Sequence, residues 1–137
     1  MSKLLLDTNI LVYAIDEDSD YFERARSVIE NSEKTLLTTS KNLAEFLAVV
    51  TRSSAYDLEP QLALDILQEI LQGVDVLFPD KSSMKIFLDL VQQYRPKGLK
   101  IHDYDIISIA LANACSEIAT FNSSDFKAVK EISLLNI

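Results

Sequence analysis

The 137-residue chain has little of several residue types on which common enzyme chemistries depend. It contains one cysteine, one histidine, two glycines and no tryptophan. The single cysteine, Cys115, cannot form an internal disulfide, which fits a reducing compartment such as the cytoplasm. Two glycines cannot build a glycine-rich phosphate loop, so a nucleotide site of the Rossmann or P-loop kind loses its main support. With His102 as the sole histidine, the chain also lacks the Cys and His ligands of a zinc site.

Long hydrophobic runs are absent as well. No apolar stretch approaches the ~20 residues that a membrane span requires. The apolar N-terminal run breaks at Asp7, which is too early for a signal peptide. Hydrophobic residues still make up 48% of the chain, enough for a sizeable core. We therefore expect residues 1–137 to form one cytoplasmic domain that does not associate with a membrane.

Short apolar segments alternate with helical patterns along the whole chain. Strands are expected at residues 3–6, 35–39, 74–78, 117–121 and 131–137. Between them, helical spacing predicts helices that begin near residue 9 and cover residues 21–30, 40–52, 60–72, 82–94 and 103–115. This alternation predicts an α/β fold in which helices cover both faces of a parallel sheet.

The charge distribution is uneven. The formal net charge is −8, which taken alone argues against binding a polyanion such as nucleic acid. Residues 81–100 differ, because Asp89 is their only acid and the basic residues there are Lys81, Lys85, Arg95, Lys97 and Lys100. Two interpretations of this basic segment remain open: a surface that contacts a phosphate backbone, or an ordinary solvated helix face and loop.

Four carboxylates lie in or beside apolar sequence, namely Asp7, Glu45, Asp103 and Asp125. In a parallel α/β sheet, ligands bind beyond the carboxyl ends of the strands. Asp7 ends the first expected strand, Asp125 follows the fourth, and Asp103 begins a helix, and helices in such folds start at that same edge. Glu45 lies in the first turns of its helix, so all four can converge.

Converging carboxylates repel each other. At ~5 Å and an effective dielectric constant of ~20, each pair costs roughly 3 kcal/mol. Three such pairs would cost about 10 kcal/mol, comparable to the whole stability of a domain. Either the acids take up protons or a cation lies among them. Oxygen ligands of this kind suit Mg²⁺ or Mn²⁺.

Each acid also has a purely structural interpretation. Asp7 and Asp103 fit as helix N-caps, and Glu45 fits a capping box with Asn42. Asp125 fits as a turn residue. A separate group of acids at residues 16, 18 and 20 has the spacing of a calcium loop, but it lacks the following glycine and the final glutamate, so we read it as a solvated loop.

Four segments in order resemble the motifs of PIN-domain nucleases, and in particular the VapC-type toxins of toxin–antitoxin pairs. They read "LLLDTNILVYA", "NLAEFLAVVTR", "IHDYDIISIALA" and "TFNSSDF", and together they span nearly the full length. The chain departs from many relatives at Tyr104, where they have a small residue, and Asp105 is an additional acid. Asp105 lies about 200° around the helix from Asp103, so both cannot face one site equally.

The resemblance implies a PIN-like three-layer α/β/α fold, cleavage of RNA and a bound Mg²⁺ or Mn²⁺. By motif position, the metal-binding and catalytic residues would be Asp7, Glu45, Asp103 and Asp125. Supporting polar residues would be Asn9, Thr120 and Asn122. Relatives of this kind also imply a homodimer and a small antitoxin protein that inserts basic residues into the acidic site. On this interpretation the basic segment at residues 81–100 would contact the RNA backbone.

Two other functions remain open. The first is a PIN-like module that binds a protein partner with weak or no cleavage, although the presence of all four acids argues against it. The second is an aspartyl phosphatase of the haloacid dehalogenase type, which also begins with a strand that ends in aspartate. Its general acid two residues later is missing, because Asn9 occupies that position.

Overall fold

A five-stranded parallel sheet forms the centre of the computed structural model, which describes residues 2–137. Its strands are β1 (Lys3–Leu6), β2 (Thr35–Thr39), β3 (Asp75–Leu77), β4 (Glu117–Ala119) and β5 (Ser133–Leu134). They lie in the order β3-β2-β1-β4-β5, and each neighbouring pair is parallel. The first strand is therefore central, with Leu5 in register with Leu37 on one side and Ile118 on the other.

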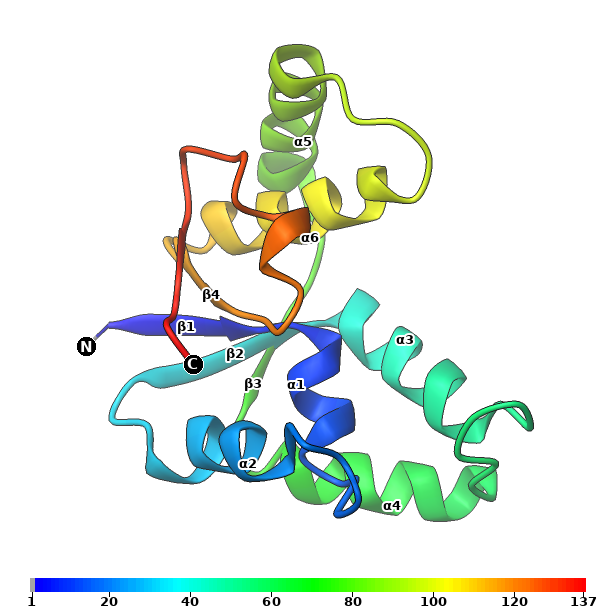
Figure 1. Ribbon diagram of the computed structural model, residues 1–137. Coiled ribbons are helices and arrows are strands. Elements are labelled where there is room, and N and C mark those ends of the chain that lie inside the picture. Colours follow the sequence, from blue (N-terminus) through cyan, green and yellow to red (C-terminus); the bar gives the residue numbers. More distant parts are fainter. Residues whose placement is uncertain (1) are drawn as a thin grey trace.

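Helices cover both faces of this sheet, as the alternating pattern predicted. They are α1 (Thr8–Tyr13), α2 (Phe22–Asn31), α3 (Ser40–Thr51), α4 (Pro60–Ile70), α5 (Lys81–Tyr94) and α6 (Lys100–Ala112). Figure 1 shows α5 and α6 above the sheet and α1 to α4 below it. The fold is thus a three-layer α/β/α arrangement, and the predicted fold class is confirmed.

The period of two along β1 divides the core into two hydrophobic clusters. Leu4 and Leu6 are fully buried against α1 to α4, together with Phe46 of α3. Leu5 points to the other face and is buried among residues of α5 and α6 that include Ile107. A strand buried on both faces must be apolar at consecutive positions, which explains the run of leucines before Asp7.

The structure corrects several predicted boundaries; for example, β4 ends at Ala119 and not at residue 121, and α6 ends at Ala112 and not at residue 115. Helix α6 begins at Lys100, three residues before the predicted start at Asp103. The reason is Gly98, whose positive φ of 63° closes the preceding turn, so that the Ile101 and His102 amides already bond to Gly98 and Leu99. The last strand is much shorter than the predicted 131–137, because β5 pairs only with the short strand β4.

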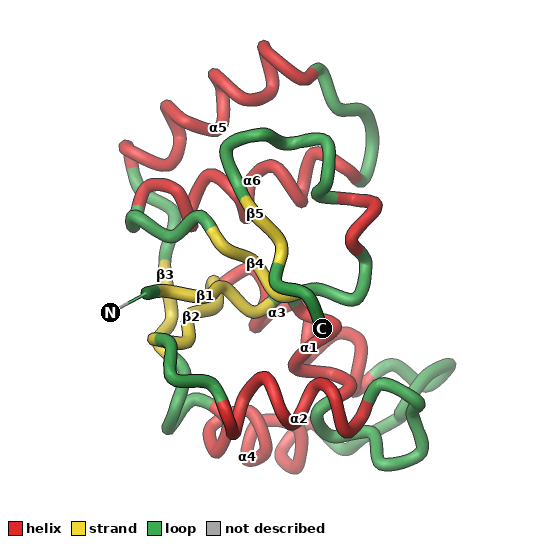
Figure 2. The backbone as a smooth tube through the Cα atoms, turned by 60° about the vertical axis from the view of Figure 1, so that its left-hand side comes forward, coloured by secondary structure: helices red, strands yellow, loops and turns green. Residues whose placement is uncertain are grey.

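The carboxyl ends of the strands meet at one edge of the sheet, where α1, α3 and the 3₁₀ helix η1 (Ser123–Asp125) begin. Figure 2 shows how the chain after β4 passes through this 3₁₀ turn and returns to the sheet as β5. Within residues 2–137 no helix has the length and apolar character that crossing a membrane requires.

Candidate active site

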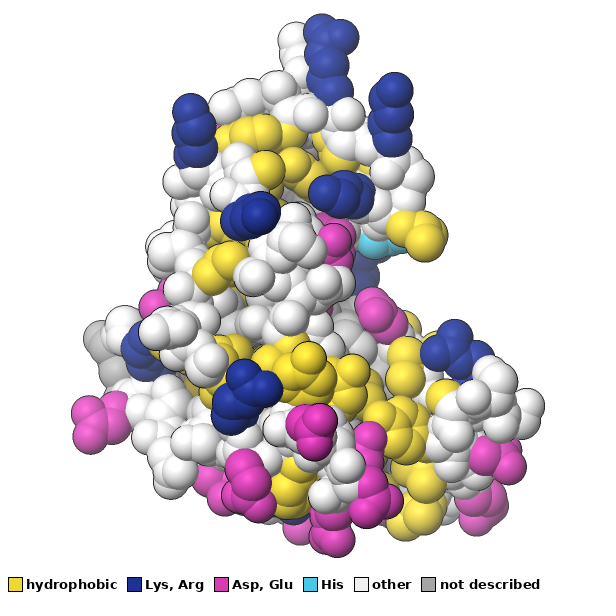
Figure 3. All heavy atoms as spheres, viewed as in Figure 1, with side chains coloured by type: hydrophobic (Ala, Val, Ile, Leu, Met, Phe, Trp, Pro, Cys, Tyr) yellow, Lys and Arg dark blue, Asp and Glu magenta, His cyan; other side chains and the backbone are white. Residues whose placement is uncertain are grey.

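The four predicted acids come from four different elements at this edge of the sheet. Asp7 follows β1, Glu45 lies in α3, Asp103 lies in the first turn of α6, and Asp125 ends η1. Glu45, Asp103 and Asp125 line one pocket of about 390 Å³, together with Leu99, Lys100 and His102. Figure 3 shows acidic side chains around a hollow between the upper and lower halves of this face. Asp7, which follows the central strand, does not line this pocket, but its charge interacts with those of Glu45 and Asp125.

Asp7 is held by a network of donors. The amide of Thr8 donates to its Oδ1 at 2.8 Å, and the hydroxyl of Thr120 donates to its Oδ2 at 2.8 Å. The side-chain amides of Asn9 and Asn42 donate at 3.3 and 3.4 Å. Asp7 is also the N-cap of α1, so the structural interpretation of this residue is confirmed and is compatible with a metal-binding role.

Asn9, at the start of α1, connects Asp7 with the segment that follows β4. Its amide nitrogen donates to Thr120 Oγ1 at 3.1 Å, and its oxygen accepts from the Phe121 amide at 3.1 Å. The predicted supporting residues Asn9 and Thr120 therefore each donate a hydrogen bond to Asp7, and they are also bonded to each other. The third, Asn122, donates through its side-chain amide to Asp125.

Burial, together with the charges of neighbouring carboxylates, raises the pKa values of Asp103 and Asp7. Burial raises the pKa of Asp103 to about 7, with further contributions from the charges of Asp125, Asp7 and Glu45, while Lys100 opposes the shift. Burial is also the largest cause of the raised pKa of Asp7, against which the Thr120 and Thr8 hydrogen bonds act, and Glu45 and Asp125 add repulsion. The four carboxylates therefore face one another without sufficient compensating positive charge.

Glu45 is available to this site because other residues cap its helix. The capping box of α3 is formed by Thr39 and Asn42, whose side chain and backbone bond reciprocally. The predicted box between Asn42 and Glu45 is therefore wrong: Asn42 occupies the third helical position itself, and Glu45 lies one turn further along. Glu45 is exposed and free to turn toward Asp103.

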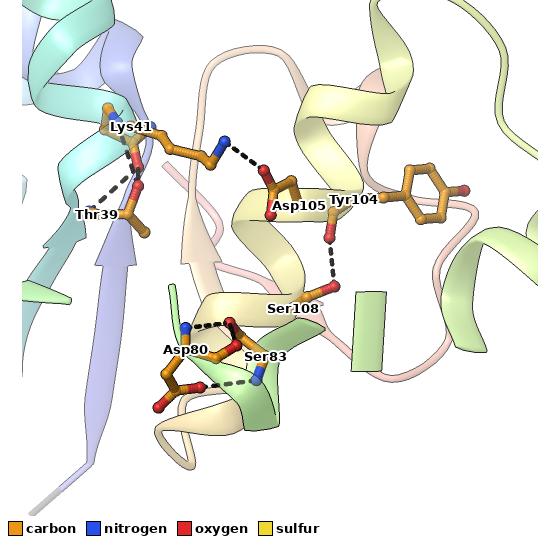
Figure 4. A network of polar contacts seen from close by, with 8 residues as sticks. Thr39, Lys41, Asp80, Ser83, Tyr104, Asp105 and Ser108 are labelled. Carbon is orange, nitrogen blue, oxygen red and sulfur yellow. Dashed lines mark hydrogen bonds and ion pairs between the residues drawn. The ribbon is translucent and has the colours of Figure 1, made fainter. Parts of the chain in front are cut away.

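Asp105 is engaged in an ion pair and does not line the acidic pocket. Its carboxylate pairs with the ammonium group of Lys41 at 2.5 Å, as Figure 4 shows. The predicted N-cap role of Asp103 is also wrong, because α6 begins earlier and Asp103 is its fourth residue. Lys41 and Asn42 are site neighbours that sequence reasoning missed, since no local pattern indicates their contacts with distant α6 and β1.

The predicted basic contacts are only partly gathered at the pocket. Lys100 lines it, whereas the other four residues are exposed and do not. Those four are Lys81, Lys85, Arg95 and Lys97. Figure 3 shows Lys and Arg side chains distributed over the half of the molecule that contains α5 and α6.

The donor set fits a hard divalent cation. All four side chains offer carboxylate oxygens, and a cation would offset the burial and the carboxylate repulsion that together raise the pKa of Asp103. Within residues 2–137 no three Asp, Glu, His or Cys side chains are already gathered as closely as a bound ion requires. Binding would therefore need side-chain rotation, which the exposed Glu45 permits.

The comparisons with known proteins agree with this geometry. A family model described as PIN domain matches residues 4–132. Ribonuclease VapC2 of Rickettsia felis is 31% identical over 129 residues, which cover 93% of this chain and 90% of that protein.

The chain belongs to the PIN-domain family.

Solved structures resemble this PIN domain over almost its entire length. The structure of VapBC2 from Rickettsia felis bound to a promoter DNA fragment has a TM-score of 0.74 at 23% identity, and 98% of each chain is covered. DNA-bound VapBC from Salmonella typhimurium has a TM-score of 0.72 at 22% identity, again with 98% of each chain covered. At such identities the likeness concerns the fold, and it agrees with the three layers described above.

Proposed function

We propose that this chain is a VapC-type ribonuclease that hydrolyses RNA phosphodiester bonds with Mg²⁺ or Mn²⁺. Asp7, Glu45, Asp103 and Asp125 would hold the cation. The observation that carries the proposal is the meeting of four mutually repelling carboxylates at the carboxyl edge of a PIN-domain sheet. The name of its relative, Ribonuclease VapC2, supports the choice of RNA as substrate.

The residues around the acids have separable tasks in this proposal. A divalent cation would polarise the scissile phosphodiester and make the attacking water more acidic. Asn9, Asn42 and Thr120 keep the Asp7 carboxylate in one orientation through hydrogen bonds. Lys100 lines the same pocket and would attract the phosphate backbone, as would the rest of the basic segment at residues 81–100.

The charge of the site also suits a protein inhibitor. An acidic pocket on a chain of net charge −8 attracts a partner that inserts arginine or lysine. Several structural neighbours are toxin–antitoxin assemblies, among them a complex from Klebsiella pneumoniae. We propose a small antitoxin of this kind as the physiological partner, a homodimer as the working form, and residues 1–137 as one domain.

The proposal is tested by incubating the purified protein with single-stranded and structured RNA in Mg²⁺, Mn²⁺ or EDTA. Cleavage is expected with either metal and not in EDTA. The Asp7→Asn variant, purified in parallel, controls for contaminating nucleases and should cleave at least about tenfold more slowly. Equal cleavage in EDTA, or by the variant, would contradict the metal mechanism. Binding of RNA without cleavage in either metal would favour a PIN-like binding module.

A further inference from the structure

A second, smaller pocket lies directly beside the acids. It has a volume of about 180 Å³ and opens between α1 and α3, and its walls include Asn9, Val12, Tyr13, Glu45 and Tyr56. Glu45 lines both this pocket and the larger one that contains Asp103 and Asp125. A molecule whose phosphate lies over the acids would therefore place its neighbouring group at this second pocket.

Two tyrosine side chains line this pocket, and the first, Tyr13, is fixed by contacts with other aromatic rings. Tyr13 packs against Tyr21 and Phe121, with ring centroids 5.0 and 5.8 Å away. The guanidinium of Arg24 in turn lies 4.9 Å from the centre of the Tyr21 ring. Such a cluster keeps the Tyr13 ring in place without a ligand.

The second tyrosine is fixed by a hydrogen bond. The hydroxyl of Tyr56 donates to Asp16 Oδ2 at 2.7 Å. Burial, followed by this bond, raises the pKa of Tyr56 to about 12, so the hydroxyl keeps its proton at neutral pH. Asp16 belongs to the acidic loop whose spacing resembled a calcium loop, and this bond gives that loop a structural task.

We propose that the pocket between α1 and α3 binds the nucleobase next to the scissile phosphate. The occupant follows from continuity with the acidic site, from the two aromatic side chains and from the size of the pocket. Proteins recognise the bases of single-stranded RNA by stacking them on aromatic side chains. Because both tyrosines are held in place, the pocket discriminates between purines and pyrimidines by fit. This inference rests on the proposed ribonuclease activity and adds a determinant of where the strand is cut.

The test compares cut sites in a random-sequence RNA pool, sequenced after partial cleavage in Mn²⁺. The wild type should show a purine or pyrimidine preference of roughly fivefold or more at one position beside the cut. Tyr13→Leu and Tyr56→Leu should each flatten that preference, and Tyr13→Phe should keep it because the ring remains. Phe78→Leu removes an aromatic ring at an exposed position outside both pockets and should leave the preference intact. Thermal melts identify any variant that fails to fold. Tyr13 ends α1 and Tyr56 lies in the connection between α3 and α4, so one variant remains informative if the other is lost.

The outcomes separate this inference from the proposed function. Cleavage by the wild type without any preference beside the cut overturns the base pocket and leaves the ribonuclease intact. A preference that survives in both leucine variants overturns it equally. Absence of cleavage by the wild type in Mn²⁺ and Mg²⁺ overturns the proposed function, and the base pocket with it. A cleavage-deficient Asp103→Asn protein provides a second readout: its affinity for short single-stranded oligonucleotides in EDTA should fall about fivefold when Tyr13→Leu is added.

Discussion

Asp7 explains why a carboxylate interrupts the apolar N-terminal segment. The three leucines before it are buried in the sheet, and the helix that follows begins at Thr8 and needs a cap. The carboxylate supplies that cap and still carries a raised pKa, because burial opposes its charge. A bound cation would offset the free energy that burying this charge still costs. The same side chain would therefore serve both the stability of the fold and the proposed chemistry.

Asp103 and Asp105 differ in their surroundings, and substituting each to Asn should separate their roles. Asp103 faces three other acids, whereas Asp105 is paired with Lys41. Asp103→Asn should lower the rate of RNA cleavage at saturating Mn²⁺ by more than about tenfold, since it removes a proposed ligand. Asp105→Asn should change the rate by less than about threefold, since it removes a partly exposed ion pair. Loss of activity in the second variant alone would show that the third ligand is misassigned.

Asp103 should also make the stability of the metal-free protein depend on pH. Its pKa is about 7 in the folded state and near 4 in the unfolded state, so between these values the folded protein binds more protons. Stability should therefore fall as pH rises from about 4 to 7 and level off above 7. Urea unfolding in EDTA at pH 5, 6, 7 and 8 measures this. Asp103→Asn should show a smaller fall, and an equal fall in both proteins would mean that other groups cause it.

The capped end of α3 helps to hold Asp7 in place. Helix α3 begins with the capping box between Thr39 and Asn42. The side-chain amide of Asn42 also donates to the hydroxyl of Thr8 at 2.9 Å and to the carboxylate of Asp7. Helix α5 begins with an equivalent box between Asp80 and Ser83 (Figure 4), whose hydrogen bonds within the described part of the chain join those two residues and not the four acids. Of these two capping boxes, only the one on α3 contacts the site.

This difference predicts the effects of Thr39→Ala and Asp80→Ala. Each should lower the free energy of unfolding by about 0.5–2 kcal/mol, because each leaves helical amide groups without a cap. Only Thr39→Ala should also slow RNA cleavage under conditions where both variants stay folded, because it releases Asn42 beside Asp7. Denaturant unfolding and cleavage rates of the two variants provide the comparison. Equal rates would mean that the cap of α3 does not position the site.

Most elements could be predicted because their causes are local. Short apolar runs predicted the strands, and Pro60 predicted the start of α4. The start of α6 could not be predicted, because Gly98 and not a capping side chain begins its first turn. The pairing of Lys41 with Asp105 and the packing of Tyr13 on Phe121 also escaped prediction. These contacts join residues far apart in the sequence, and only the folded sheet brings them together.

The candidate site lies where both layers of helices meet the sheet. Asp7 comes from the central strand, Glu45 from the layer below, and Asp103 from the layer above. Each layer has its own hydrophobic cluster, and the strands are the main contact between the two. A cation bound by these acids would connect both layers and the sheet. Its binding should therefore stabilise the entire fold and not a single loop.

A series of thermal melts at increasing Mn²⁺ concentration tests whether the four carboxylates form a cation site. A ligand at a hundred times its Kd stabilises the folded state by about 2.7 kcal/mol. For a domain of this size the wild-type Tm should then rise by about 10 °C relative to EDTA, in a concentration-dependent manner. Asp7→Asn should rise much less, and Asp105→Asn should rise like the wild type. A wild-type Tm that does not respond to Mn²⁺ or Mg²⁺, or an equal rise in Asp7→Asn, would contradict the site and the mechanism proposed from it.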